Sequence, residues 1–494
     1  MKRYRPYAPE QSYLLPPSPR EWLPEGHLAK FVLDLVGELD LSVIEKVVQA
    51  KDPRGEQPYA PRMMTALLLY AYATGIFSSR RIEKATVEDL AFRFLSGNEQ
   101  PHFTTINEFR ATHREALAAL FEQLLAACMS AGLVKLGHVA IDGTKMKANA
   151  SKHKAMSYDR MVKDDARIRA EVEALLSQAE AVDAAEDKAE GAYDPKEEIR
   201  RREERLAKMA QVREALRRET AAKRAARLEE QATELREKAV DPATSPRDQR
   251  GFQTLADTRD RQAAGIKPAE QEVPDDDSDD DLPRNTPPST KTGEPKPHAQ
   301  RNFTDPQSRL MTRDGAFLQA YNGQIAVDEE HQIIVAAALS NQGPDNQYFE
   351  PMLRRVVENC DAVPERVTGD AGYFSAQNVR AAEAMGCEPF IAVGGHLRNG
   401  LPDEESSLPQ FKTEVHAAMR AVLDTEMGRA AYARRKATVE PVFGQIKSCR
   451  GFRQMSFRGL FKNRCEWLFV CATHNLLKLW RAMTAKKAAL ALAA

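Results

Sequence analysis

Apolar residues recur every three or four positions from His27 to Ser130, which predicts several amphipathic helices in an all-α N-terminal domain, residues 1–130. In the last of these stretches, Thr104 or Thr105 can cap a helix. That helix would present three side chains able to contact bases or phosphates, Asn107, Arg110 and Arg114. A polar face that touches only water explains the same residues equally well. This domain is therefore expected to bind DNA or a second subunit rather than to carry out chemistry.

Short apolar runs of strand type then replace the helical pattern. Val134–Ile141 has the character of a buried strand that ends at Asp142. Further along, Phe317–Val327 and Gln332–Ala338 alternate and then run apolar, which predicts a strand hairpin, and a helix is expected over residues 346–360.

A second pairing of strand and acid follows the hairpin. Val367 ends a short apolar run, Asp370 comes three residues later, a helix is expected to begin near Ser375, and residues 387–394 read as another strand. Acids at the carboxyl ends of buried strands are well placed for a site, because ligands collect at strand ends in open α/β sheets. For Asp142 or Asp370 alone, an ordinary turn aspartate is about as good an explanation as catalysis.

Residues 151–300 separate these two parts and are expected to be an insertion in a catalytic domain made of residues 131–150 and 301–485. Residues 155–240 consist largely of Ala, Glu, Lys, Arg, Leu and Gln, with a helix-start signature at Asp194 and Pro195. We therefore expect an antiparallel helical hairpin, which would serve as a dimerisation arm, a DNA clamp or a solvated spacer. Residues 241–300 are rich in Pro, Asp and Ser and are expected to be a disordered acidic linker.

Chain length and charge add two expectations to this picture, the number of domains and the kind of partner. A chain of 494 residues is long enough for two or three domains. Its net charge of −1 hides ten basic residues against one acid, Glu440, between positions 429 and 464, and nucleic acid is the natural partner of such a segment. The six cysteines show no paired spacing, and no apolar run approaches a membrane span, so a soluble cytoplasmic protein without a zinc site is expected.

The basic segment contains the stretch YARRKATVEPVFGQIK, residues 432–447. Thr438 is expected to cap a new helix that has Pro441 in its first turn, where a missing N–H costs little. Glu440 and Lys447 then share one helix face, roughly 10 Å apart along the axis, a spacing that suits a metal ligand and a phosphate clamp. The alternative is an amphipathic helix with a solvated charged edge.

Two acids at strand ends and a third on a late helix form the layout of an RNase H-like catalytic core with a mixed sheet. Three carboxylates suit such a site because they can hold two hard cations while leaving positions open for phosphate oxygens and water. A phosphatase of the haloacid-dehalogenase kind also uses Asp-Gly-Thr, the sequence at Asp142, but it needs a nucleophilic Asp where this chain has Ala140.

Four blocks of the sequence resemble those of bacterial insertion-sequence transposases of the DDE class with an all-helical N-terminal domain. They are VAIDGTKMKANASKHKAMSYDRM, TDPQSRLM, VTGDAGYFSAQNV and ATVEPVFGQIK, and matching positions extend over most of residues 20–485. The resemblance implies that Asp142, Asp370 and Glu440 bind the metal. It places the family's signature of Tyr, a basic residue, Glu and Lys on Tyr432, Lys436, Glu440 and Lys447; Arg is usual where Lys436 stands, and Arg435 is adjacent.

What the resemblance implies is a DDE transposase that cleaves DNA at element ends and joins them to target DNA, using two Mg²⁺ ions, with Mn²⁺ as a substitute. The expected DNA-binding residues are Tyr432, Arg435, Lys436, Lys447 and Arg110. A homodimer or higher synaptic oligomer in the bacterial cytoplasm, at the nucleoid when bound to DNA, is expected. Two other hypotheses are a catalytically inactive DNA-binding protein that keeps the fold, and a coiled-coil interaction protein whose basic tail is incidental.

Overall fold

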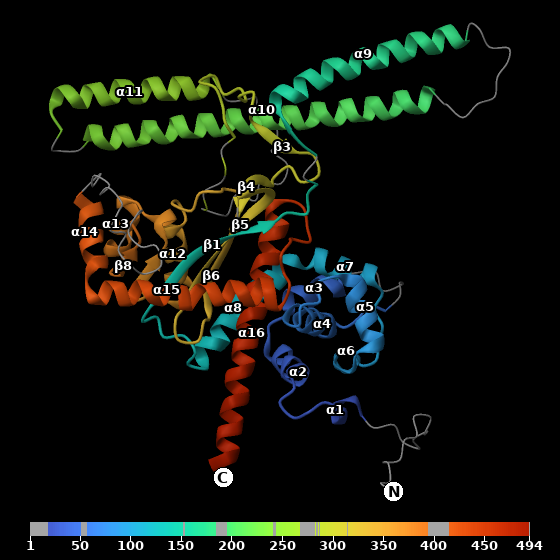
Figure 1. Cartoon of the computed structure of the whole chain (residues 1–494), viewed down its shortest axis with the longest axis vertical. Helices are drawn as coiled ribbons and strands as arrows, with labels where there is room; N and C mark the ends of the chain where they lie inside the picture. Colours follow the sequence, from blue (N-terminus) through green and yellow to red (C-terminus); the bar gives the residue numbers. More distant parts are fainter. Residues whose placement is uncertain are drawn as a thin grey trace.

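The computed structural model describes residues 18–50, 57–151, 154–183, 195–240, 244–266, 282, 285, 287–313, 315–393 and 414–493 (Figure 1). None of the described helices is both long and apolar enough to cross a membrane. The acidic run DDDSDDD at 275–281, part of the linker predicted to be disordered, and the predicted cap Asp194 lie outside the described residues.

The N-terminal region is helical, as predicted. Its helices are α1 (Pro19–Trp22), α2 (Leu28–Glu38), α3 (Ser42–Gln49), α4 (Pro61–Ala73), α5 (Ser79–Glu88), α6 (Leu90–Leu95), α7 (Phe103–Thr112) and α8 (Arg114–Ser130). Helix α4 is the central one, because every residue from Met64 to Ala73 is buried. The predicted cap of α7 is wrong: the helix begins one residue before Thr104, and the ring of His102 accepts from the Thr104 N–H.

A mixed sheet forms the second layer, as the sequence predicts. Its strands are β1 (Val139–Lys147), β4 (Arg309–Arg313), β5 (Ala316–Asp328), β6 (Ile334–Ser340), β7 (Arg366–Gly369) and β8 (Glu388–Ile391). The order is β4-β5-β1-β7-β8, with β6 also paired to β5. Strand β1 is antiparallel to β5 and parallel to β7, which is parallel to β8. This arrangement of strands with flanking helices fits an RNase H-like core.

Local signals located most elements of this layer. The strand hairpin β5–β6 is confirmed, as are helices α12 (Phe349–Cys360) and α13 (Ala376–Ala384), whose cap Ser375 accepts from the Asn378 N–H at 3.0 Å. The predicted strand Val134–Ile141 is wrong in its limits. It starts at Val139 and continues to Lys147, because β5 pairs with it along its whole length, so Asp142 lies within the strand rather than after it.

The C-terminal part consists of helices α14 (Glu414–Asp424), α15 (Glu426–Gly444) and α16 (Leu460–Ala493), with a π-helical turn, η3 (Gln445–Cys449), after α15. A new helix at Thr438 was predicted, and this is wrong: α15 runs through Thr438 and Pro441, and the Thr438 hydroxyl donates to Arg434 O. The missing N–H of Pro441 leaves the Ala437 carbonyl without its helical donor. Gln332 Nε2 donates to that carbonyl at 3.1 Å instead.

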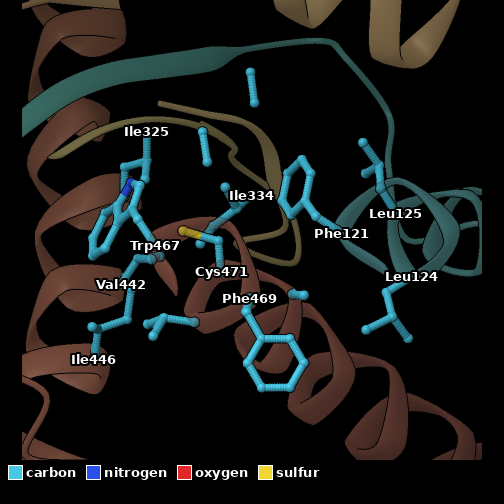
Figure 2. Close-up of a cluster of buried hydrophobic side chains, with 14 of the residues drawn as sticks. Phe121, Leu124, Leu125, Ile325, Ile334, Val442, Ile446, Trp467, Phe469 and Cys471 are labelled. Carbon is cyan, nitrogen blue, oxygen red and sulfur yellow. The ribbon is translucent and has the colours of Figure 1, made fainter. Parts of the chain in front are cut away.

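Helix α16 is packed between α8 and the sheet. Figure 2 shows Trp467, Phe469 and Cys471 of α16 among apolar side chains of α8, β5, β6 and α15. Gly323 permits the contact with the sheet, because a Cβ there would lie 3.0 Å from the Trp467 ring. The start of α16 also contacts the N-terminal region: Glu466 accepts from the Tyr72 hydroxyl at 3.0 Å, and both groups are buried.

The insertion is an elongated helical layer that extends away from the sheet (Figure 1). It contains α9 (Tyr158–Asp183), α10 (Pro195–Val240) and α11 (Pro246–Ala264), and a small sheet of β2 (Ala155–Ser157) and β3 (Gln300–Asn302) forms its base. Helices α9 and α10 occupy the residues of the predicted hairpin, and an ion pair of Arg202 with Glu171 joins them. The prediction of disorder over 241–300 is wrong for α11, which packs along α10 through buried Ala263, Leu228 and Ala225.

One buried ionic cluster joins the insertion to the sheet. Glu219 of α10 accepts from Arg301 of β3 and from Arg309 of β4, each at 2.7 Å. Burial alone would raise the pKa of Glu219, but Arg309, Lys223 and Arg301 together lower it below its ordinary value. The cluster therefore favours the ionised carboxylate and fixes α10 to two strands.

We predict that Glu219→Ala lowers the free energy of unfolding by about 3–5 kcal/mol, because it leaves two buried guanidinium groups without their counter-charge. The matched control is Glu214→Ala on the same helix, where the lost partner is the half-exposed Arg218 and the cost should stay below about 1 kcal/mol. Chemical unfolding followed by circular dichroism measures both. Equal losses in the two variants would show that the Glu219 cluster is not an anchor.

Candidate active site

Asp142 lies on β1, and Asp370 directly follows the neighbouring strand β7, close enough for its charge to act on Asp142. The parallel register pairs Val139 with Val367 and Ala140 with Thr368, so Asp142 and Asp370 are each two residues further along. Asp142 Oδ1 accepts from the Gly143 N–H at 2.7 Å, and Asp370 Oδ1 accepts from the Gly372 N–H at 2.8 Å. The second bond caps the short helix η2 (Ala371–Tyr373). Two of the predicted acids are therefore brought together.

Arg435 of α15 is the cation of this site. Its Nη1 donates to Asp142 Oδ2 at 3.0 Å, and its side chain is only 8% exposed. One helical turn earlier, Tyr432 stacks near it, with 5.6 Å from the guanidinium carbon to the ring centroid. Arg435 is therefore directed at the acid rather than at solvent, which corrects the expectation that it contacts DNA from the surface.

Burial is the largest influence on the pKa of Asp142. It raises the pKa of this carboxyl to about 6, although Arg435 acts in the opposite direction, and the neighbouring Asp370 raises the pKa further. Burial also raises the pKa of Tyr432. Burial thus disfavours the ionised form of Asp142, and carboxyl groups with pKa values perturbed in this way are common in functional sites.

Glu440 does not join the two aspartates in this structure. Its side chain is exposed, whereas the buried face of α15 carries Arg435, Thr438, Val439 and Val442. Among the residues that the structure describes, no group of three or more His, Cys, Asp or Glu side chains is placed to hold a metal ion. The carboxylate pair Asp142–Asp370 has the oxygen donors that a hard divalent cation prefers, but the three-acid set is not assembled.

The other predicted basic residues fall in different places. Lys447 lies on η3, and its ammonium group donates to the Thr144 hydroxyl, two residues after Asp142 on the same face of β1, and lies 5.8 Å from the Phe443 ring centroid. Lys436 is exposed. The structure thus places Lys447 beside the acid-bearing strand and Lys436 on the surface of α15.

Arg110 is a correction. It is 8% exposed, and its Nη1 donates to the Tyr72 hydroxyl at 3.0 Å and to the Phe77 carbonyl at 2.8 Å. Its Nη2 donates to Asn107 at 3.1 Å. These contacts make Arg110 a structural link between α7 and α4, and its Nη groups are already occupied by protein acceptors.

A polar cluster that the sequence analysis missed lies on the opposite face of β1. Asp345 Oδ1 accepts from Lys145 at 3.2 Å, from Asn322 at 2.6 Å and from Gln324 at 2.8 Å. A Cβ at Gly143 would lie 2.9 Å from Asp345 Oδ1, so the glycine of Asp-Gly-Thr lets this cluster approach. That glycine was the available signal; Asp345 itself lies in a loop without a motif.

Two family models match the chain. Residues 288–476 match the transposase DDE domain, and residues 17–112 match a transposase domain (DUF772). The chain belongs to the insertion-sequence DDE transposases. No curated protein and no solved structure matches it. The DDE match includes Asp370 and Glu440 but begins after β1. Asp142 is therefore included in the candidate site only because it lies beside Asp370.

Membership in this family makes transposition the function of the protein, with DNA as the substrate. The family typically uses a divalent metal. In this transposase the carboxylates of Asp142 and Asp370 are oxygen donors of the kind that such a cation prefers.

We predict that, without divalent cations, the contribution of Asp142 to the stability of the transposase falls as pH rises from about 4 to about 6. Unfolded Asp142 ionises near its ordinary pKa of 3.8 and the folded residue near 6, so the folded state binds more protons in this window and loses that advantage as pH rises through it. Asp142→Asn should remove this pH dependence. Above pH 6, its free energy of unfolding should exceed that of the wild type by up to about 3 kcal/mol.

Chemical unfolding in a chelator at pH 5 and pH 8 measures this difference. Asp159→Asn, the same change at a half-exposed surface acid of α9, is the control and should alter stability by less than about 0.5 kcal/mol. Added Mg²⁺ should stabilise the wild type and not Asp142→Asn. Parallel pH profiles of wild type and Asp142→Asn would contradict the burial of this acid.

Proposed function

We propose that this transposase cleaves DNA at the ends of its element and transfers the freed 3′ ends into target DNA, with two Mg²⁺ ions bound by Asp142, Asp370 and Glu440, and Mn²⁺ as a substitute. The observation that carries the proposal is the position of Asp142 on β1 beside Asp370, which directly follows the parallel strand β7, within a chain of this family. When bound, the ions would activate the attacking oxygen and stabilise the leaving oxygen of a phosphodiester exchange.

The protein's own groups have separate roles in this proposal. Asp142 and Asp370 bind the cation from the sheet, and Glu440 supplies the third carboxylate from α15. Arg435 neutralises Asp142 in the arrangement seen here, before Glu440 joins the two aspartates. Lys447, beside Thr144, binds a DNA phosphate next to the acids, and Tyr432 and Lys436 border the same site.

The inactive DNA-binding protein is the alternative. Its support is the exposed position of Glu440 and the ion pair that Arg435 makes with Asp142. The buried Asp142 argues against this alternative. Burial disfavours its ionised carboxylate and so reduces stability, and such costly groups typically occur where they serve function. A coiled-coil interaction protein accounts for the layer of α9, α10 and α11 but leaves the paired aspartates without a role.

Assembly and location belong to the same proposal. Strand transfer brings two element ends and a target together, so we propose a homodimer or higher oligomer acting at the nucleoid in the cytoplasm. We further propose that residues 151–300 are an insertion outside the catalytic domain of residues 131–150 and 301–485, in which the layer of α9, α10 and α11 organises that assembly.

We predict that Asp142→Ala, Asp370→Ala and Glu440→Ala each reduce nicking and strand transfer at least tenfold, because each removes a metal ligand. DNA affinity measured without metal should change little, since the basic surface remains. Labelled duplexes carrying the element ends, incubated with Mg²⁺ or Mn²⁺, provide the assay. Glu426→Ala, at another exposed acid of α15, is the control and should keep full activity.

The outcomes separate the hypotheses. A wild-type protein that binds the ends but never nicks them with either metal is the inactive DNA-binding protein. If a single alanine variant retains more than a tenth of wild-type nicking, that residue is not part of the site. Glu440 is tested most severely, because the structure does not place it with the other two acids.

A further inference from the structure

The loop between β6 and α12 carries an acid, Asp345, that the proposed chemistry does not use. Two glycines let this loop approach both candidate acids. A Cβ on Gly143, the residue after Asp142, would lie 2.9 Å from Asp345 Oδ1. A Cβ on Gly372 would lie 3.8 Å from Asp345 Cβ and 3.0 Å from Asp370 Oδ1. The loop therefore packs against the backbone beside Asp142 and beside Asp370.

The carboxylate of Asp345 is fully engaged by donors of the protein. Its Oδ1 accepts from Asn322 at 2.6 Å and from Gln324 at 2.8 Å, both on β5. Lys145 of β1 donates to the two carboxylate oxygens at 3.2 Å and 3.3 Å, and to the Gly343 carbonyl at 2.6 Å. Asp345 is therefore committed to β1 and β5 and is not a free ligand for a cation.

Gln324 carries the contact of Asp345 further into the site. Its side chain is buried, Nε2 donates to Asp345, and Oε1 accepts from the hydroxyl of Tyr373. An ionised carboxylate can only accept, so Asp345 requires the amide N–H of Gln324 to face it and leaves the amide oxygen for Tyr373. The same amide lies where any Cβ on Gly143 would overlap it. Asp345 thereby sets the orientation of the group that lies between β1 and Tyr373.

Tyr373 belongs to the turn that Asp370 begins. Its side chain is fully buried, and its N–H donates to the Asp370 carbonyl at 3.1 Å within η2. A second link joins this turn to the loop of Asp345. Asn378 Nδ2 donates to the carbonyls of Asn346 and Tyr373, each at 2.7 Å. Two buried routes therefore connect the Asp345 loop to the turn that holds Asp370.

We propose that Asp345 is a positioning residue for the candidate metal site: through Gln324 and Tyr373 it holds the turn of Asp370 against β1, which carries Asp142. The assignment rests on the proposed function. Groups that hydrogen-bond around metal ligands fix the orientation of those ligands, and their loss typically lowers metal affinity about tenfold to a hundredfold.

Stability alone explains this cluster poorly. The side chains of Asp345 and Lys145 are 23% and 17% exposed, so both charges are largely removed from water. Apolar residues of similar size in place of such a pair are often as stable or more stable, because the charges lose their hydration. A role in orienting the neighbouring acids gives the charged pair a function that apolar packing could not supply.

The test measures binding of Mn²⁺ to the full chain, without DNA, by electron paramagnetic resonance of the free ion. Asp345→Asn keeps the shape of the side chain but removes the charge and turns one acceptor into a donor. It should raise the Mn²⁺ dissociation constant about tenfold. The matched control is Asp361→Asn, at the exposed acid that ends α12, which should bind Mn²⁺ as the wild type does.

A neutral variant separates positioning from charge, because removal of any nearby negative charge also weakens cation binding. Tyr373→Phe changes no charge but breaks the contact with Gln324, and it too should weaken Mn²⁺ binding about tenfold. The double variant should lose no more than the larger single loss, since both changes interrupt one path. Wild-type affinity in Tyr373→Phe would assign the effect to charge alone and overturn the proposal.

A final comparison separates metal binding from folding. Glu219→Ala, predicted above to destabilise the chain at the insertion, should bind Mn²⁺ like the wild type at a temperature where circular dichroism shows both to be folded. A loss of affinity that Glu219→Ala shares with Asp345→Asn would overturn the proposal. Equal affinity of the wild type and Asp345→Asn would overturn this inference alone. A wild type that binds no Mn²⁺ would refute the metal site of the proposed function, and this inference with it.

Discussion

The pairing of β1 on both of its edges determines where the candidate site residues of this transposase lie. Strand β5 pairs with it over all nine residues, and β7 pairs with it in parallel just before Asp142. The antiparallel partner keeps β1 extended past Asp142, so Asp142 and Thr144 face α15 while Gly143 and Lys145 face the Asp345 cluster. A one-residue slip of this register would exchange the two faces and remove Asp142 from both Asp370 and Arg435.

The same strand connects the active site to the rest of the chain through α16. Trp467 packs on Gly323 of β5, which is paired with Thr144 of the adjacent strand β1. The indole N–H of Trp467 donates to Gln324 O at 3.3 Å. One residue earlier, the Glu466 carboxylate accepts hydrogen bonds from the Tyr72 hydroxyl and, at 2.7 Å, from the Ser456 N–H. Because the Tyr72 hydroxyl also accepts from Arg110, buried polar contacts fix the N-terminal helices relative to the sheet.

Local chemistry explains which parts of this structure could be predicted from the sequence. Ser375 caps α13 within three residues, and the apolar run of β5 lies within its own sequence, so both elements were located correctly. The limits of β1 and the course of α15 depend on distant partners. Pro441 is tolerated inside α15 because Gln332, more than a hundred residues away, donates to the carbonyl that Pro441 leaves free. Burial of Arg110 likewise depends on Tyr72 and Phe77, which helical periodicity around Arg110 does not reveal.

The third acid shows the limit of motif spacing most clearly. Arg435 and Glu440 are five residues apart on one continuous helix, which places them about 140° apart around its axis. Since Arg435 faces Asp142, Glu440 faces away from that carboxylate, in agreement with its exposed side chain. The residues between them, Thr438 and Val439, are buried, so α15 cannot present Glu440 to the aspartates without turning this packed face. An arrangement in which all three acids converge therefore requires α15 to rotate about its axis and Arg435 to leave Asp142, and the two events are coupled because both residues belong to the same rigid helix.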